Sequence, residues 1–118
     1  MLVVDDNEDN REIYATMLRH AGFEVEVACD GEEALAVARR FLPEVVIMDL
    51  GMPVMDGWEA IKALRADPDT KHAYVVVVSG FADSRSRARA TEAGCDEFLA
   101  KPCLPRDLTA VITRALDR

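Results

Sequence analysis

Several apolar segments of this sequence are followed directly by a polar residue that can take part in chemistry. Four segments end in this way, at Asp5 with Asp6, at Asp49, at Ser79 and at Lys101. A carboxylate can bind a hard cation or act as a nucleophile on phosphorus. A serine hydroxyl donates a hydrogen bond, and a lysine ammonium supplies a compact positive charge. These residue types favour a shared site, provided that the fold brings the segment ends together.

The chain alternates between predicted strands and predicted helices. Apolar or alternating runs predict strands at 1–5, 24–28, 45–48, 74–78 and 97–100. Helical spacing and end signals predict helices at 7–20, 30–41, 56–66, 84–93 and 105–116. Near-continuous apolar strands joined by helices predict a parallel sheet covered on both faces, with right-handed crossovers. In a doubly wound α/β sheet of order 2-1-3-4-5, strands one, three, four and five end close together, where such sheets bind ligands.

Helical spacing also predicts which side chains face the core. In the first helix Ile13, Met17 and Ala21 recur at i, i+4 spacing, with Tyr14 and Leu18 beside them, and we expect this face to be buried. In the third helix we expect Ile61 and Leu64 to be buried. The second helix is predicted to present one apolar face, formed by Ala34, Leu35, Ala38 and Leu42.

Three carboxylates at one sheet edge would repel one another by roughly 4 kcal/mol per pair at an effective dielectric constant near 20. Such a cluster favours a bound cation, and oxygen-only ligands favour Mg²⁺. The calcium-loop pattern of an EF-hand is missing. Lys101 fits either a structural ion pair with these acids or a contact to a phosphoryl oxygen, and both readings stay open.

Composition limits the classes of function. The 118 residues fit one domain, 1–118, and half of them are hydrophobic. A net charge of −8 argues against direct nucleic-acid binding, and no apolar stretch suggests a membrane span or a secretory signal. The three cysteines, Cys29, Cys95 and Cys103, lack metal-ligand spacing, so we expect small buried thiols and a cytoplasmic location.

Taken in order, the motifs resemble the receiver domain of bacterial two-component response regulators over essentially the whole chain. The segments that carry the resemblance are Val3-Val4-Asp5-Asp6, Asp49 with Met52-Pro53-Val54-Met55-Asp56-Gly57, Ser79-Gly80, and Phe98-Leu99-Ala100-Lys101-Pro102. The resemblance implies a flavodoxin-like (βα)5 fold. It also implies a switch that is controlled by phosphorylation of an aspartate.

The resemblance assigns a role to each site residue. Asp49 would accept the phosphoryl group, while Asp5, Asp6, Asp49 and the backbone carbonyl of Gly51 would hold Mg²⁺, with Mn²⁺ as an alternative. Ser79 and Lys101 would contact the phosphoryl oxygens. The donor would be a phosphohistidine on a sensor histidine kinase or on a histidine phosphotransfer protein.

The resemblance also implies a conformational readout. Ser79 would move toward the phosphoryl group, and Phe98 stands at the position of the family's switch aromatic. An aromatic ring that only packs is an equally open reading of Phe98. The last two helices and the strand between them would form the output surface. Gly51 and Gly80 depart from the commoner pattern, and we expect them, together with Phe81, to tune the phosphoryl lifetime.

Three other classes of protein share part of this pattern. A metal-dependent phosphatase with an aspartate nucleophile would require a second aspartate, as general acid, at the position of Gly51. A phosphate-independent interaction module would be expected to have lost Asp49 or Lys101, and both are present. A flavin binder would place a phosphate loop where the acidic run Asp5–Asp9 stands.

The remaining features concern assembly and surface. The chain starts at its first strand and stops after its last helix, which favours excision from a longer regulator or a hybrid kinase. A linked or separate output domain is therefore expected, and a homodimer stays open. The surface is predicted to include His20 and His72. The arginines at 85, 87 and 89 are expected to form a solvated face, or part of a partner or dimer surface.

Overall fold

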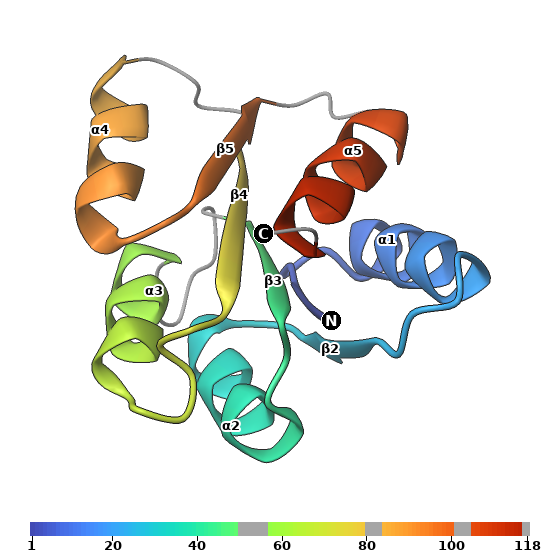
Figure 1. Ribbon diagram of the computed structural model, residues 1–118, viewed down its shortest axis with the longest axis horizontal. Coiled ribbons are helices and arrows are strands. Elements are labelled where there is room, and N and C mark those ends of the chain that lie inside the picture. Colours follow the sequence, from blue (N-terminus) through green and yellow to red (C-terminus); the bar gives the residue numbers. More distant parts are fainter. Residues whose placement is uncertain (50–56, 80–83, 101–104, 117–118) are drawn as a thin grey trace.

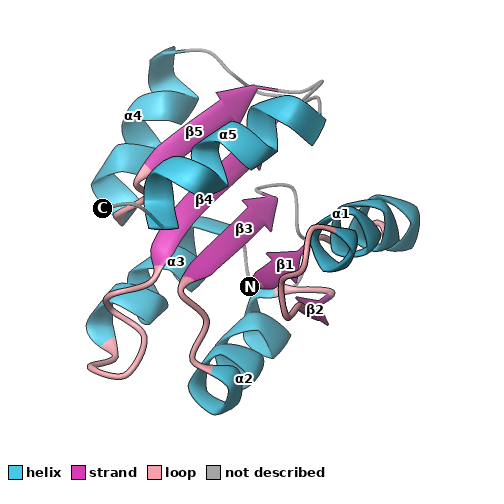
Figure 2. Ribbon diagram, turned by 45° about the vertical axis from the view of Figure 1, so that its right-hand side comes forward, coloured by secondary structure: helices cyan, strands magenta, loops and turns pink. Residues whose placement is uncertain are grey.

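The computed structural model describes residues 1–49, 57–79, 84–100 and 105–116 (Figure 1). Of Asp49 it describes the backbone. Five strands form one parallel sheet of order β2-β1-β3-β4-β5, and the arrowheads in Figure 2 point the same way. The strands are β1 (Leu2–Val4), β2 (Glu26–Ala28), β3 (Val45–Asp49), β4 (Tyr74–Ser79) and β5 (Glu97–Ala100). The prediction of a doubly wound, flavodoxin-like α/β fold is confirmed.

Five helices connect the strands and cover the sheet on both faces (Figure 1). They are α1 (Glu8–His20), α2 (Gly31–Phe41), α3 (Gly57–Ala66), α4 (Ser84–Ala93) and α5 (Pro105–Leu116). Helices α2, α3 and α4 pack on one face, over Val46, Met48 and Val77. Helices α1 and α5 pack on the other face, over Ile47 and Val76. This alternation along β3 and β4 follows from the two-residue period of a strand.

Polar side chains cap the helices at their first turns. The Asn7 side chain accepts a hydrogen bond from the Asn10 N–H at 3.0 Å, and Asp30 accepts one from the Glu33 N–H at 2.8 Å. At the other end of α1, Gly22 has φ +97° and lets the Phe23 N–H reach the Leu18 carbonyl. These local signals explain why the helix ends agree well with those predicted from the sequence.

Three predictions of buried side chains were wrong. Ala21 is exposed, because α1 ends at His20 and Ala21 is the residue after it. Ile13 is 61% exposed, because the buried stripe of α1 is centred on Ala15 and Leu18 and leaves Ile13 on the opposite side. Leu42 is 56% exposed, because α2 ends at Phe41 and Leu42 turns into the left-handed region at φ +54°. The predictions for Ile61 and Leu64 are confirmed, since both are fully buried.

The cysteine prediction was also wrong in part. Cys29 and Cys95 are only half-buried, although both are free thiols. Cys29 directly follows the edge strand β2, and Cys95 precedes β5 in the turn after α4, so neither reaches the interior of the sheet. Cys103 lies outside the described residues. No described helix has both the length and the apolar character that crossing a bilayer requires.

Candidate functional site

The register of the sheet brings the predicted site residues to its carboxyl edge. Val4 pairs with Met48, so the next residues, Asp5 and Asp49, leave neighbouring strands at the same level. Asp49 in turn pairs with Val78 of β4. This shared level is the structural basis of the candidate site.

The two strands that follow extend the same edge. Ser79 comes one position after the β4 partner of Asp49, and it pairs with Ala100, the last residue of β5. Lys101 is the next residue after β5 in the sequence, and it lies outside the described residues, as does Gly51. The backbone register supports the predicted convergence, and the side-chain contacts of Asp49, Gly51 and Lys101 stay predictions.

Asp5 is the best-defined acid at this edge. Only 2% of its surface is exposed, and its Oδ1 accepts a hydrogen bond from the Asn7 N–H at 2.9 Å. Its backbone carbonyl accepts a second bond, from Nη1 of Arg11 at 2.9 Å. The adjacent Asp6 is exposed. The pair thus combines a carboxylate fixed by the start of α1 with one that faces solvent.

Ser79 also lies in the protein interior, with 2% of its surface exposed. It ends the fully buried stretch Val75–Val78. Burial of a hydroxyl is costly unless it is hydrogen-bonded. The backbone of Ser79 is held in place by its strand, β4, which is buried on both sides. A small shift of this strand end would change what the hydroxyl contacts.

Arginines of α4 contact two aromatic side chains near this edge. The Arg87 guanidinium carbon lies 4.7 Å from the centroid of the Phe98 ring, and the corresponding atom of Arg89 lies 5.2 Å from the centroid of a Trp58 ring. Both distances suit cation–π attraction. Both rings are half-buried and pack against the core beneath α2, α3 and α4. The predicted solvated face of α4 therefore has a structural role that the sequence analysis missed.

The donor set at the edge fits a hard divalent cation. Asp5 and Asp6 offer only carboxylate oxygens, and the half-buried Cys29, which follows the neighbouring strand β2, is not a competing thiolate. The Glu33 carboxylate that accepts a hydrogen bond from Cys29 Sγ at 3.3 Å raises the pKa of that thiol, and burial raises it further. Among the described residues, no three His, Cys, Asp or Glu side chains form a group that could hold a metal. The predicted set also needs the Asp49 side chain and Gly51, which lie outside what the structure describes.

A parallel sheet of order β2-β1-β3-β4-β5, covered by helices on both faces, places the chain in the doubly wound α/β class. The chain belongs to the response regulator receiver domain family, because the sequence model of that family matches residues 1–113.

Three similar proteins illustrate this membership. A probable transcriptional regulator, ycf27, from Porphyridium aerugineum is 36% identical over 118 residues, which are the whole of this chain and 48% of the relative. The chemotaxis protein CheY4 of Vibrio cholerae superimposes with a TM-score of 0.92 at 34% identity, covering 97% of this chain and 95% of that chain. The receiver domain of the sensor histidine kinase PA1611 from Pseudomonas aeruginosa PAO1 has a TM-score of 0.91 at 29% identity, with coverages of 99% and 96%.

The comparisons also bear on size and on metal use. The chain spans about half the length of the curated relative ycf27. The structure of the PA1611 receiver domain is described with a magnesium ion coordinated in its active-site cleft.

Proposed function

We propose that the chain is a phosphorylation switch in which Asp49 accepts a phosphoryl group from a phosphohistidine. The observation that supports this proposal is the strand register, in which β1, β3, β4 and β5 end at one edge of the sheet, close to positions 5, 49 and 79. The donor would be a sensor histidine kinase or a histidine phosphotransfer protein. The function is regulatory, because the chain itself is the acceptor and is not a catalyst that acts on a separate substrate.

The reaction is a displacement at phosphorus. A carboxylate oxygen of Asp49 forms a bond to phosphorus while the bond from phosphorus to the donor imidazole breaks. The imidazole nitrogen keeps the electron pair and takes up a proton. The product is an acyl phosphate on Asp49 and a neutral histidine on the donor.

The neighbouring groups would bind and orient the reacting atoms. Asp5, Asp6, Asp49 and the Gly51 carbonyl would hold Mg²⁺, which when bound neutralises charge on the transferred group. Ser79 would donate a hydrogen bond to one phosphoryl oxygen, and Lys101 would pair with another. Asp5 is suited to its part because its hydrogen bond with Asn7 fixes the carboxylate before any ligand arrives.

The readout would pass through β4 and β5. A phosphoryl group adds up to about two negative charges and several strong acceptors beside Ser79. Ser79 pairs with Ala100 at the end of β5, and Phe98 lies two positions before Ala100. A shift of Ser79 would therefore change the packing around Phe98. Phe98 is stacked under Arg87, so the ring and α4 would move together. The last two helices and β5 would thereby present a changed surface to a partner or output domain, according to how strongly the phosphoryl group favours one state.

The experiment is phosphorylation with acetyl phosphate in the presence of Mg²⁺, followed by intact mass measurement. We expect the gain of one phosphoryl group, and its loss on treatment with hydroxylamine, which cleaves acyl phosphates and spares serine phosphate. Asp49→Asn should abolish the gain. Asp9→Asn, which removes an exposed acid from the first turn of α1, is the matched control and should leave it intact.

Two outcomes would contradict the proposal. A wild-type protein that gains no phosphoryl group with either Mg²⁺ or Mn²⁺ would point to a phosphate-independent interaction module. A hydroxylamine-resistant gain would show that the acceptor is not a carboxylate.

A further inference from the structure

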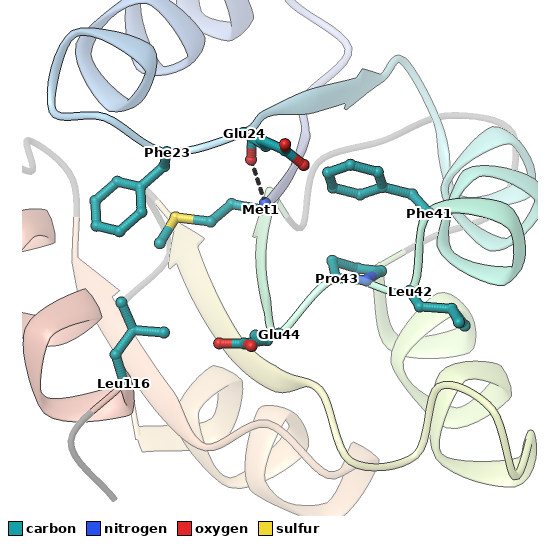
Figure 3. Close-up of a pocket in the computed structure, with 8 residues that line it drawn as sticks. All are labelled: Met1, Phe23, Glu24, Phe41, Leu42, Pro43, Glu44 and Leu116. Atoms are coloured by element: carbon teal, nitrogen blue, oxygen red, sulfur yellow. Dashed lines mark hydrogen bonds between the residues drawn. The ribbon is translucent and has the colours of Figure 1, made fainter.

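Two hollows open at the amino end of the sheet, opposite the candidate site. Each has a volume of about 340 Å³, and they share Leu42, Pro43, Glu44 and Leu116 as lining residues. β3 starts directly after Glu44 and ends at Asp49, so the whole strand separates this end from the phosphoryl site. We refer to the surface formed by these four residues with Met1, Phe23, Glu24 and Phe41 as the basal groove (Figure 3).

The apolar walls of the basal groove are unusually exposed. Leu42 is 56% exposed and Leu116 is 40% exposed. In the described part of the chain, Ile13 is the only other large hydrophobic residue that is exposed. Leu42 also has φ +54°, a left-handed conformation that disfavours a residue with a Cβ atom. Glycine would suit this position better. Residues in strained backbone conformations cluster at active sites, ligand clamps and switch regions.

The groove is also negatively charged. Figure 3 shows the carboxylates of Glu24 and Glu44 on opposite sides of Met1. Both residues are exposed, and neither forms a salt bridge with Lys or Arg in the part of the chain that the structure describes. Burial lowers the pKa of the Met1 ammonium, while Glu24, Glu44 and Glu26 act to raise it. Three carboxylates therefore make the electrostatic potential around Met1 more negative.

We propose that the basal groove binds an extended segment of a partner polypeptide in which a bulky apolar side chain lies next to Lys or Arg. The apolar side chain would pack between Leu42, Pro43 and Leu116, and the cation would lie near Glu24 and Glu44. Hollows of this size lie at the lower end of the range for small ligands and suit one large side chain better than a whole domain. The proposal does not rest on phosphoryl transfer, because it concerns the other end of the sheet.

The first test uses synthetic peptides and the ¹⁵N-labelled protein. The probe is the acetylated and amidated peptide Gly-Arg-Leu-Arg-Gly. One control peptide replaces both arginines by glutamate, and a second replaces the leucine by serine. We expect the probe to shift the backbone amide signals of Phe23, Leu42 and Glu44, with both controls binding about fivefold more weakly or worse. Equal binding of the three peptides, shifts confined to another surface, or no shifts would overturn the proposal.

The second test uses variants that stay folded. Glu44→Gln should weaken binding of the probe about threefold, and Glu92→Gln, an exposed acid on α4, should not. Leu42→Gly removes one apolar wall while relieving the left-handed strain, so binding should fall without loss of thermal stability. Unchanged binding in Leu42→Gly would refute the role of that wall.

A second copy of the chain is the competing occupant. Sedimentation velocity over a range of concentrations separates the two. Self-association that is lost in Leu42→Gly, together with failure of the probe peptide to compete with it, would replace the peptide proposal by a homodimer interface.

Discussion

Arg65 joins three separate parts of the fold through one side chain. Its Nε donates to the Gly94 carbonyl at 2.9 Å, and its Nη2 contacts Asp96 Oδ2 at 2.7 Å. Its Nη1 donates to the carbonyls of Lys71 and Ala73. The end of α3, the start of β4 and the turn before β5 are thus held by one guanidinium. We predict that Arg65→Met, which keeps the apolar stem and removes these donors, destabilises the protein strongly.

The magnitude follows from the hydrogen bonds that are lost. A hydrogen bond involving a charged group contributes about 1.5–3 kcal/mol when buried, and less where water can replace it. The Arg65 side chain is 24% exposed and Asp96 is 30% exposed, so water can satisfy part of the set. Asp96 also keeps its bond from the Val75 N–H at 2.8 Å. We therefore expect the free energy of unfolding to fall by about 3 kcal/mol.

The assay is urea unfolding followed by circular dichroism at constant pH and salt. Arg65→Lys keeps the charge without the fork of donors, and it should fall between wild type and Arg65→Met. Arg40→Met is the matched control, because Arg40 is exposed in the last turn of α2 and its side chain forms no hydrogen bond or ion pair within the described residues. A loss below about 1 kcal/mol in Arg65→Met would refute the reasoning, since it would match an ordinary exposed pair.

Three further changes test other parts of the structure. Gly94→Ala should lower the free energy of unfolding by about 2 kcal/mol or more, because φ is +110° and the new Cβ would lie 2.9 Å from Arg65 Cγ. Gly22→Ala has open space around the new Cβ, so it should lower the free energy of unfolding only by the backbone strain. Urea unfolding of both variants measures the difference. The hydrogen bond from the Asp69 N–H, and then Arg39, lower the pKa of Asp67, so its contribution to stability is full above the unfolded-state pKa and is lost as the pH falls through the lowered native value. The stability difference between wild type and Asp67→Asn should accordingly shrink as the pH falls below about 4, the ordinary value for an aspartate, and a constant difference would contradict this. Arg89→Ala should shift the emission of Trp58 to longer wavelength by removing the group stacked on the ring, while Arg85→Ala should leave it unchanged.

The architecture was predictable because its signals are local. Apolar runs such as Val75–Val78, capping residues such as Asn7 and Asp30, and the positive-φ Gly22 and Gly94 each act within a few residues. The order of polar residues at the strand ends then followed from the rule that parallel sheets bind ligands at their carboxyl edge. The burial of Asp5 and Ser79 agrees with that placement.

What the sequence could not supply depends on contacts between distant segments. Arg87 and Arg89 are two positions apart on α4, so they leave the helix on different sides and reach rings on β5 and α3. No periodic signal marks such pairs. Helical spacing misplaced Ile13 because apolar residues surround much of α1, and only packing against the sheet selects the buried stripe. It misplaced Leu42 because helical spacing was extended one residue past the helix, which ends at Phe41.

The most direct test of the central claim is to locate the phosphoryl group by chemistry at the modified residue. Borohydride reduces an acyl phosphate on aspartate to homoserine, and tandem mass spectrometry of the digested protein then identifies the position. We predict that, after incubation with acetyl phosphate and Mg²⁺, homoserine is found at position 49 and at no other aspartate. Modification at Ser79, at Asp5 or Asp6, or at no residue would contradict the account.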